Sequence, residues 1–75
     1  MYTIKIQYVD NSCQSFEHIL KVEYTDGMDE TFTVLDNEIL QHNFPLGFDL
    51  FLFAENAKYS ASGRSAKFIS VFKEQ

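Results

Sequence analysis

The sequence predicts an all-β fold, and three observations carry that prediction. Apolar and polar residues alternate with period two over several segments, which is typical of strands that bury one face. Glycine, asparagine and aspartate separate these segments at the positions expected of tight turns. Eight Phe and four Tyr in 75 residues supply a dense apolar core. The length allows one domain, which we expect to span residues 1–75.

The first two expected strands show the alternation most clearly. Residues 2–9 alternate from Tyr2 onward, and residues 16–25 form a longer second strand. The inner face of that second strand is expected to carry Phe16, His18, Leu20, Val22 and Tyr24. Ile19 breaks the pattern because it falls on the outer face. Ile4, Leu20 and Phe32 are expected to share one dry interior.

Asp26-Gly27 is the strongest turn signal in the chain, and a third strand follows it with Met28, Phe32 and Val34 as its apolar set. A two-residue loop pairs Thr25 with Met28. A three-residue loop pairs Tyr24 with Met28 and Leu20 with Phe32, with Gly27 in a left-handed bulge. We favour the second register because it keeps the apolar side chains on one face. It also brings Glu30 opposite Val22.

Residues 36–43 are the one helix candidate, and a bent strand is the alternative. Asp36 is a suitable helix N-cap, with Leu35 and Leu40 as a hydrophobic staple, and Pro45 ends the segment. A helix here would make the fold α+β with one short helix.

The last third of the chain reads as three strands. Residues 48–54 are apolar on both faces, which predicts a central strand. A turn at Glu55-Asn56 pairs Leu52 with Tyr59 and Leu50 with Ala61. A turn at residues 62–65 leads to a last strand over residues 66–73. The resulting architecture is a five- to six-stranded antiparallel meander that forms a small barrel or roll.

Catalytic and metal-binding motifs are sparse. Cys13, His18 and a carboxylate could form a nucleophilic set, but we interpret them as a loop thiol and a histidine of the core or its rim. The spacing of Cys13 and His18 matches no common zinc site. The three glycines stand far apart, so there is no phosphate-binding loop. We expect neither enzymatic activity nor a cofactor.

Charge is distributed unevenly along the chain. Residues 1–56 hold two basic and ten acidic residues, whereas residues 57–75 hold four basic residues and one acid. One interpretation is an ordinary solvated surface whose signs happen to be segregated. Another is self-association, in which the basic C-terminal hairpin of one subunit meets the acidic sheet of another. The first strand carries only Lys5, so it is the expected docking edge, whereas Lys67 and Lys73 protect the last strand from unwanted pairing.

The sequence therefore favours a small protein-interaction module that self-associates as a homo-oligomer. We expect a cytoplasmic location, since the alternating N-terminus does not resemble a signal peptide and a single cysteine fits a reducing compartment. We expect no membrane association, because no apolar run approaches the ~20 residues needed to cross a bilayer. One alternative is a nucleic-acid-binding small barrel that uses the basic C-terminal hairpin, with Tyr59 or Phe68 stacking on bases. Another is an acidic inhibitor that imitates nucleic acid. The candidate partner-binding residues are Lys58, Tyr59, Arg64, Lys67, Lys73, Glu23 and Glu30.

Overall fold

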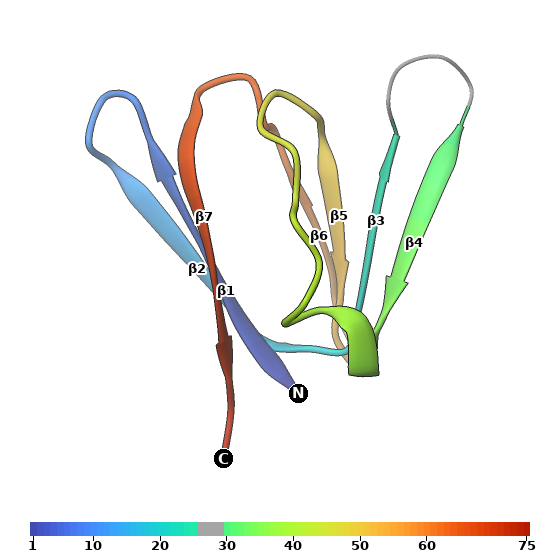
Figure 1. Cartoon of the computed structure of the whole chain (residues 1–75). Helices are drawn as coiled ribbons and strands as arrows, with labels where there is room; N and C mark the ends of the chain where they lie inside the picture. Colours follow the sequence, from blue (N-terminus) through green and yellow to red (C-terminus); the bar gives the residue numbers. More distant parts are fainter. Residues whose placement is uncertain (26–29) are drawn as a thin grey trace.

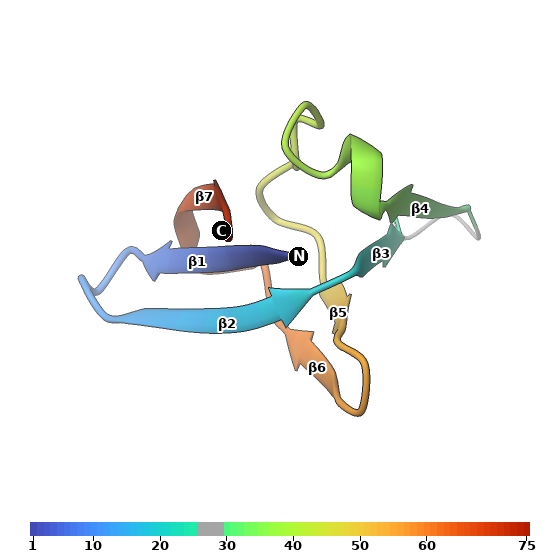
Figure 2. The same ribbon diagram turned by 90° about the horizontal axis from the view of Figure 1, so that it is seen from below.

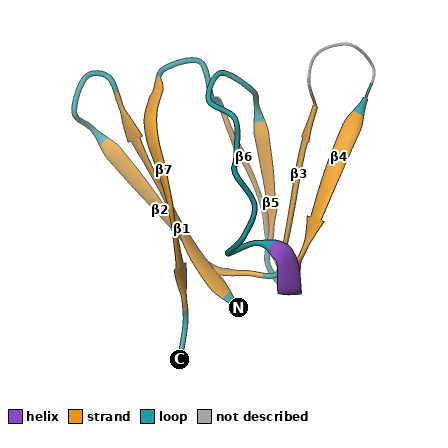
Figure 3. Cartoon of the chain, in the orientation of Figure 1, coloured by secondary structure: helices purple, strands orange, loops and turns teal. Residues whose placement is uncertain are grey.

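The computed structural model describes residues 1–25 and 30–75, and the expectation of a mostly β, antiparallel fold is confirmed (Figures 1 and 3). The described strands are β1 (Tyr2–Tyr8), β2 (Cys13–Ile19), β3 (Lys21–Thr25), β4 (Thr31–Leu35), β5 (Leu50–Phe53), β6 (Lys58–Ala61) and β7 (Ala66–Lys73). A single 3-10 turn, η1 (Asp36–Glu38), follows β4. None of the described helical residues forms a segment long and apolar enough to cross a bilayer.

The strands form two sheets, with the orders β2-β1-β7 and β4-β3-β5-β6 (Figure 2). The meander is therefore wrong, because β7 returns to pair with β1 and β5 pairs with β3 instead of β4. Among the described strands the two sheets do not close into one barrel. The first strand, expected to be a docking edge, is instead the centre of its sheet and is paired on both sides.

The expected second strand is divided at Leu20 into β2 and β3, and β2 contains a β-bulge near His18. Tyr2 pairs with Ile19 and Ile4 pairs with Phe16, so the register shifts by one residue between them. His18 has φ 61°, a left-handed conformation that histidine adopts more readily than branched residues. The faces change only locally at the bulge: Ile19 is fully buried, the His18 side chain is exposed and Leu20 is half-buried, while Val22 and Tyr24 are buried as expected. The expected inner face was wrong at His18.

The β3–β4 register differs from both expected alternatives. Tyr24 pairs with Phe32 and Val22 with Val34, so Glu30 does not lie opposite Val22. This register joins apolar residues of the same face. The predicted left-handed bulge at Gly27 and the beginning of the strand at Met28 lie outside the described residues.

The segment after β4 is helical only over η1. Leu35 occupies the N-cap position without a side-chain hydrogen bond, so the expected capping by Asp36 is wrong. Leu35 and Leu40 are both exposed, and Ile39 is the residue of this segment that enters the core. Beyond η1 the segment forms turns and loop, so residues 36–43 form neither the expected two-turn helix nor the alternative bent strand.

The expected residue pairs between β5 and β6 and the expected bounds of β7 are confirmed. Leu52 pairs with Tyr59 and Leu50 with Ala61, as the Glu55-Asn56 turn predicts, and β7 has the expected bounds. β5 is an internal strand of its sheet, as its two-sided apolar sequence predicts. However, β6 and β7 belong to different sheets, so the predicted C-terminal hairpin is wrong.

The core lies between the two sheets. Its fully buried large side chains are Ile4, Ile6, Ile19, Val22, Ile39, Leu50 and Leu52. Of the three residues expected to share the interior, Ile4 is buried, Leu20 is half-buried and Phe32 is 40% exposed. Phe32 is exposed because β4 is at the border of its sheet, where a side chain has neighbours on one side only.

Candidate interaction surface

The predicted basic residues do not form one patch. Lys58 and Tyr59 lie on β6, Arg64 lies in the following turn, and Lys67 and Lys73 lie near the two ends of β7. Because β6 and β7 belong to different sheets, Lys58 and Tyr59 lie on one sheet and Lys67 and Lys73 on the other.

Tyr59 and Phe68 differ in how accessible their rings are. The Tyr59 ring centroid lies 5.3 Å from that of Phe16, so this ring helps to join the two sheets. Phe68 is 55% exposed, and the Lys67 ammonium lies 5.7 Å from its ring centroid. Of these two predicted stacking residues, Phe68 is the more accessible.

The outer face of the four-stranded sheet combines lysines with aromatic rings. The Lys21 ammonium lies 4.4 Å from the ring centroid of Phe53, and Lys58 lies 5.2 Å from that of Phe51 and 5.4 Å from that of Phe53. These separations allow cation–π attraction. Sequence reasoning missed the two phenylalanines because their strand was expected to be buried on both faces.

A shallow hollow of about 350 Å³ lies beside Phe51. It is lined by Asp49, Phe51, Ser60, Ala61, Ser62 and Arg64. One cation, one carboxylate and an aromatic edge thus meet at the end of β5. Such a surface can contact a planar, partly anionic group by stacking and by charge.

The two predicted acidic residues are in different settings. Glu23 forms an ion pair with Lys21, with 3.3 Å between Oε2 and Nζ, so its charge is largely balanced. Glu30 is exposed and immediately precedes β4. Asp36 immediately follows the same strand. Glu30 therefore belongs to a strand edge with an acid at each end.

β4 is the least protected sheet edge among the described strands. It pairs only with β3, and Figure 1 shows it at the border of the molecule. Its sequence, Thr31-Phe32-Thr33-Val34-Leu35, has no charged residue, and Leu35 is 52% exposed. Edge strands are usually protected by charges, proline or bulges. The composition was visible in the sequence, but its position at an edge depends on the strand order.

β7 is a second edge of different chemistry. Among the described strands it pairs with β1 alone, and Phe68 and Phe72 on its outer face are 55% and 54% exposed. Lys67 and Lys73 lie near its two ends.

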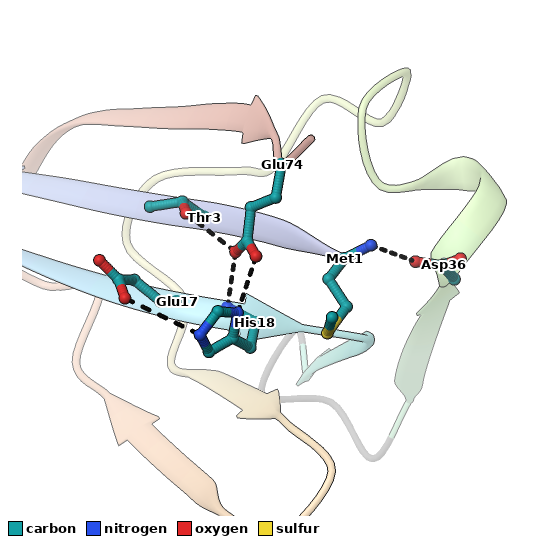
Figure 4. A network of polar contacts seen from close by, with 6 residues as sticks. All are labelled: Met1, Thr3, Glu17, His18, Asp36 and Glu74. Carbon is teal, nitrogen blue, oxygen red and sulfur yellow. Dashed lines mark hydrogen bonds and ion pairs between the residues drawn. The ribbon is translucent and has the colours of Figure 1, made fainter.

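A polar network fastens the C-terminus to the bulge in β2 (Figure 4). Glu74 Oε2 accepts hydrogen bonds from the His18 backbone N–H at 2.7 Å and from the Thr3 hydroxyl at 3.0 Å. The other carboxylate oxygen lies 2.7 Å from His18 Nδ1. The hydrogen bond from the His18 backbone N–H, followed by those from the side chains of His18 and Thr3, lowers the pKa of Glu74. These contacts hold the residue after β7 against β1 and β2, which is a structural role.

The Cys13–His18 arrangement does not form a nucleophile–base pair. Cys13 begins β2 and His18 lies near its end, so the strand separates them by about 15 Å. His18 is instead engaged by Glu74. Within residues 1–25 and 30–75, no group of three or more His, Cys, Asp or Glu side chains is placed to hold a metal ion.

Comparisons with protein-family models, with curated proteins and with solved structures each find no match to the chain.

Proposed function

We propose that the chain is a protein-interaction module that accepts an added strand on the free edge of β4. The observation that carries this proposal is the uncharged sequence of β4 together with its single neighbour, β3. A strand in this position presents backbone N–H and C=O groups that an extended segment can satisfy, as in β-strand addition.

The side chains of β4 support the same function. Phe32 stacks on Tyr24 with 5.2 Å between ring centroids, yet 40% of its surface remains exposed. Leu35, on the opposite face, is 52% exposed. An added strand would remove apolar surface from water on both faces, which contributes about 25 cal/mol for each Å² buried.

A lysine in the middle of β4 tests this proposal. Thr33 is exposed and lies opposite Glu23, so Thr33→Lys places a cation beside a carboxylate and is compatible with the fold. The same lysine discourages edge pairing. We expect this variant to lose self-association measured by light scattering, or to lose a partner captured from the native host.

Two controls make the result specific. Gln7→Lys adds the same charge to the outer face of β1, which is paired on both sides. Thr33→Val changes β4 without adding charge. Both are expected to retain binding. Hydrogen exchange must also slow at the amides of residues 31–35 when the bound species is present. Equal binding by Thr33→Lys and the wild type would refute the proposal.

A second candidate function, binding of single-stranded nucleic acid, is favoured by the rings of Phe51 and Phe53 beside Lys21 and Lys58. Aromatic rings on a sheet can stack on bases while nearby cations contact phosphates. The test is titration of a mixed single-stranded oligonucleotide pool at low salt. Binding should weaken steeply with salt and with Lys58→Ala or Arg64→Ala. An unchanged signal at every oligonucleotide concentration would exclude this function.

A further inference from the structure

The two edges β4 and β7 carry opposite charges at equal spacing. Glu30 and Asp36 flank β4, and Lys67 and Lys73 lie near the ends of β7. In both cases the two charged residues are six positions apart in the sequence, with five residues between them. Each strand has a hydrogen-bonded neighbour on one side only among the described strands.

In one antiparallel register between β4 of one copy and β7 of another, both acidic residues lie opposite lysines. Glu30 then lies opposite Lys73 of the second copy, and Asp36 lies opposite Lys67 of that copy. The five intervening pairs, with the β4 residue first, are Thr31–Phe72, Phe32–Val71, Thr33–Ser70, Val34–Ile69 and Leu35–Phe68. Opposite-charge and aromatic–β-branched pairs are the stabilising kinds of cross-strand contact.

The same register also matches the two faces of each sheet. Phe32 and Val34 lie on the core side of their sheet, as shown by their pairing with the buried Tyr24 and Val22. Ile69 and Val71 lie on the core side of the other sheet, opposite the buried Ile6 and Ile4. Pairing β4 with β7 therefore joins the two sheets edge to edge, so that their core sides lie on the same face of the combined sheet. A slip of one residue would lose this match.

The outer face of the joined sheets gains an apolar contact as well. Leu35, 52% exposed, would lie beside Phe68, 55% exposed. Both belong to the exposed apolar surface of the single chain, and the pairing covers them together.

Symmetric pairings lack this complementarity. A β4–β4 pair centred on Thr33 sets Glu30 against Asp36 at both ends. A β7–β7 pair centred on Ser70 sets Lys67 against Lys73. Like charges directly opposite each other are destabilising, so each edge favours the other edge over a copy of itself.

We propose that the strand added to β4 is β7 of a second copy of this chain, so that copies join head to tail. This inference rests on the proposed function of β4. A contact between two different surfaces leaves one free β4 and one free β7 at the ends of every open assembly. Such assemblies close into rings or grow as filaments.

Single charge reversals distinguish this arrangement from the symmetric ones. Glu30→Lys creates a repulsion with Lys73 of the next copy, and Lys67→Glu creates one with Asp36. We expect each to weaken self-association, measured by sedimentation velocity at low salt, by about fivefold to tenfold. In a symmetric β4–β4 or β7–β7 pair, Glu30→Lys or Lys67→Glu respectively would strengthen association, because it would create an attractive pair.

A second reversal on the same chain should restore assembly. The double variant Glu30→Lys/Lys73→Glu recovers the wild-type affinity if the pairing is antiparallel. Glu38→Lys is the matched control, since it changes net charge equally at an exposed residue outside the register. It should retain the wild-type affinity. Thermal unfolding of each variant confirms that the fold is retained.

The outcomes separate this inference from the function on which it rests. If Thr33→Lys abolishes self-association but Glu30→Lys does not weaken it, β4 accepts a different strand and the head-to-tail inference is wrong. A monomer at every concentration that captures a different protein through β4 also overturns the inference but leaves the proposed function intact. If Thr33→Lys changes no binding at all, both are wrong.

Discussion

The carboxylate of Glu74 accepts the backbone N–H of His18 at 2.7 Å across 56 positions of sequence. The amide it binds belongs to the bulged residue of β2, whose φ is 61°. The bulge leaves this N–H without a place in the β1–β2 ladder, and Glu74 supplies its acceptor. A residue at the end of the chain therefore stabilises the point where the core face of β2 changes.

The first prediction concerns acid stability. Because hydrogen bonding to His18 lowers the pKa of Glu74 in the folded state, its stabilising effect is complete above the ordinary glutamate value of 4.5. It is lost as the pH falls through the lower, folded value. Glu74→Gln should have a lower thermal midpoint than the wild type at neutral pH, and the two should converge in acid. Glu55→Gln, in the β5–β6 turn, is the control and should follow the wild type throughout.

The second prediction tests the reversal of faces at the bulge. Ile19 is fully buried, so Ile19→Ala should cost about 2–5 kcal/mol of unfolding free energy in urea denaturation. Leu20 is half-buried, so Leu20→Ala should cost about 1 kcal/mol, well below the Ile19 variant. The opposite ranking would mean that the alternation continues through residue 18 without a bulge.

These two residues also show where sequence reasoning succeeded and failed. Alternation is a local signal, and it placed β7, the β5–β6 turn and the pair Leu52–Tyr59 correctly. The same signal failed at Ile19, because the one-residue shift in the β1–β2 register brings Ile19 to the core side, whereas Val22 and Tyr24 remain buried as the alternation predicts. The sequence pattern shows Ile19 as an irregularity, but the hydrogen bond between His18 and Glu74 at the bulge joins residues 56 positions apart, which a local pattern does not reveal.

The candidate site was harder to predict than the fold class because it depends on strand order. The absence of charge in β4 is a property of five neighbouring residues, yet its exposure as an edge requires β5 to pair with β3. The basic C-terminal residues appeared to form one patch because they are close in sequence. Pairing of β7 with β1 separates Lys67 and Lys73 from Lys58.

The third prediction concerns the hydroxyl of Tyr24, a buried residue. Its oxygen lies 2.8 Å from His42 Nε2, and the ring also packs against Phe32, Phe44 and Phe48. Tyr24→Phe keeps the ring contacts and removes the hydrogen bond, so it should cost about 0.5–1.5 kcal/mol in chemical denaturation. Tyr59→Phe is the comparison, because the Tyr59 ring contact with Phe16 does not involve its hydroxyl. If both variants lose equal stability, the Tyr24–His42 bond contributes nothing specific.

The fourth prediction concerns Gly63, which is buried beside the backbone of Phe48. A Cβ at this position would collide with the Phe48 carbonyl oxygen and would approach the Phe48 nitrogen to 2.8 Å. Because both are backbone atoms, the clash cannot be relieved by a rotamer change, and the segment that leads into β5 must move. Gly63→Ala should therefore cost about 1–3 kcal/mol in chemical denaturation.

Gly47 provides a contrast with a different mechanism. Its φ is +95° and a Cβ at this position would have no atom within 4 Å, so Gly47→Ala is strained by its backbone conformation alone. Both alanine variants should be destabilised, but the close approach to Phe48 matters only for Gly63→Ala. A second-site change that loosens the 44–48 segment, Pro45→Ala, should recover part of the loss in Gly63→Ala and none of the loss in Gly47→Ala. Equal recovery in both would show that steric contact with Phe48 is not the cause.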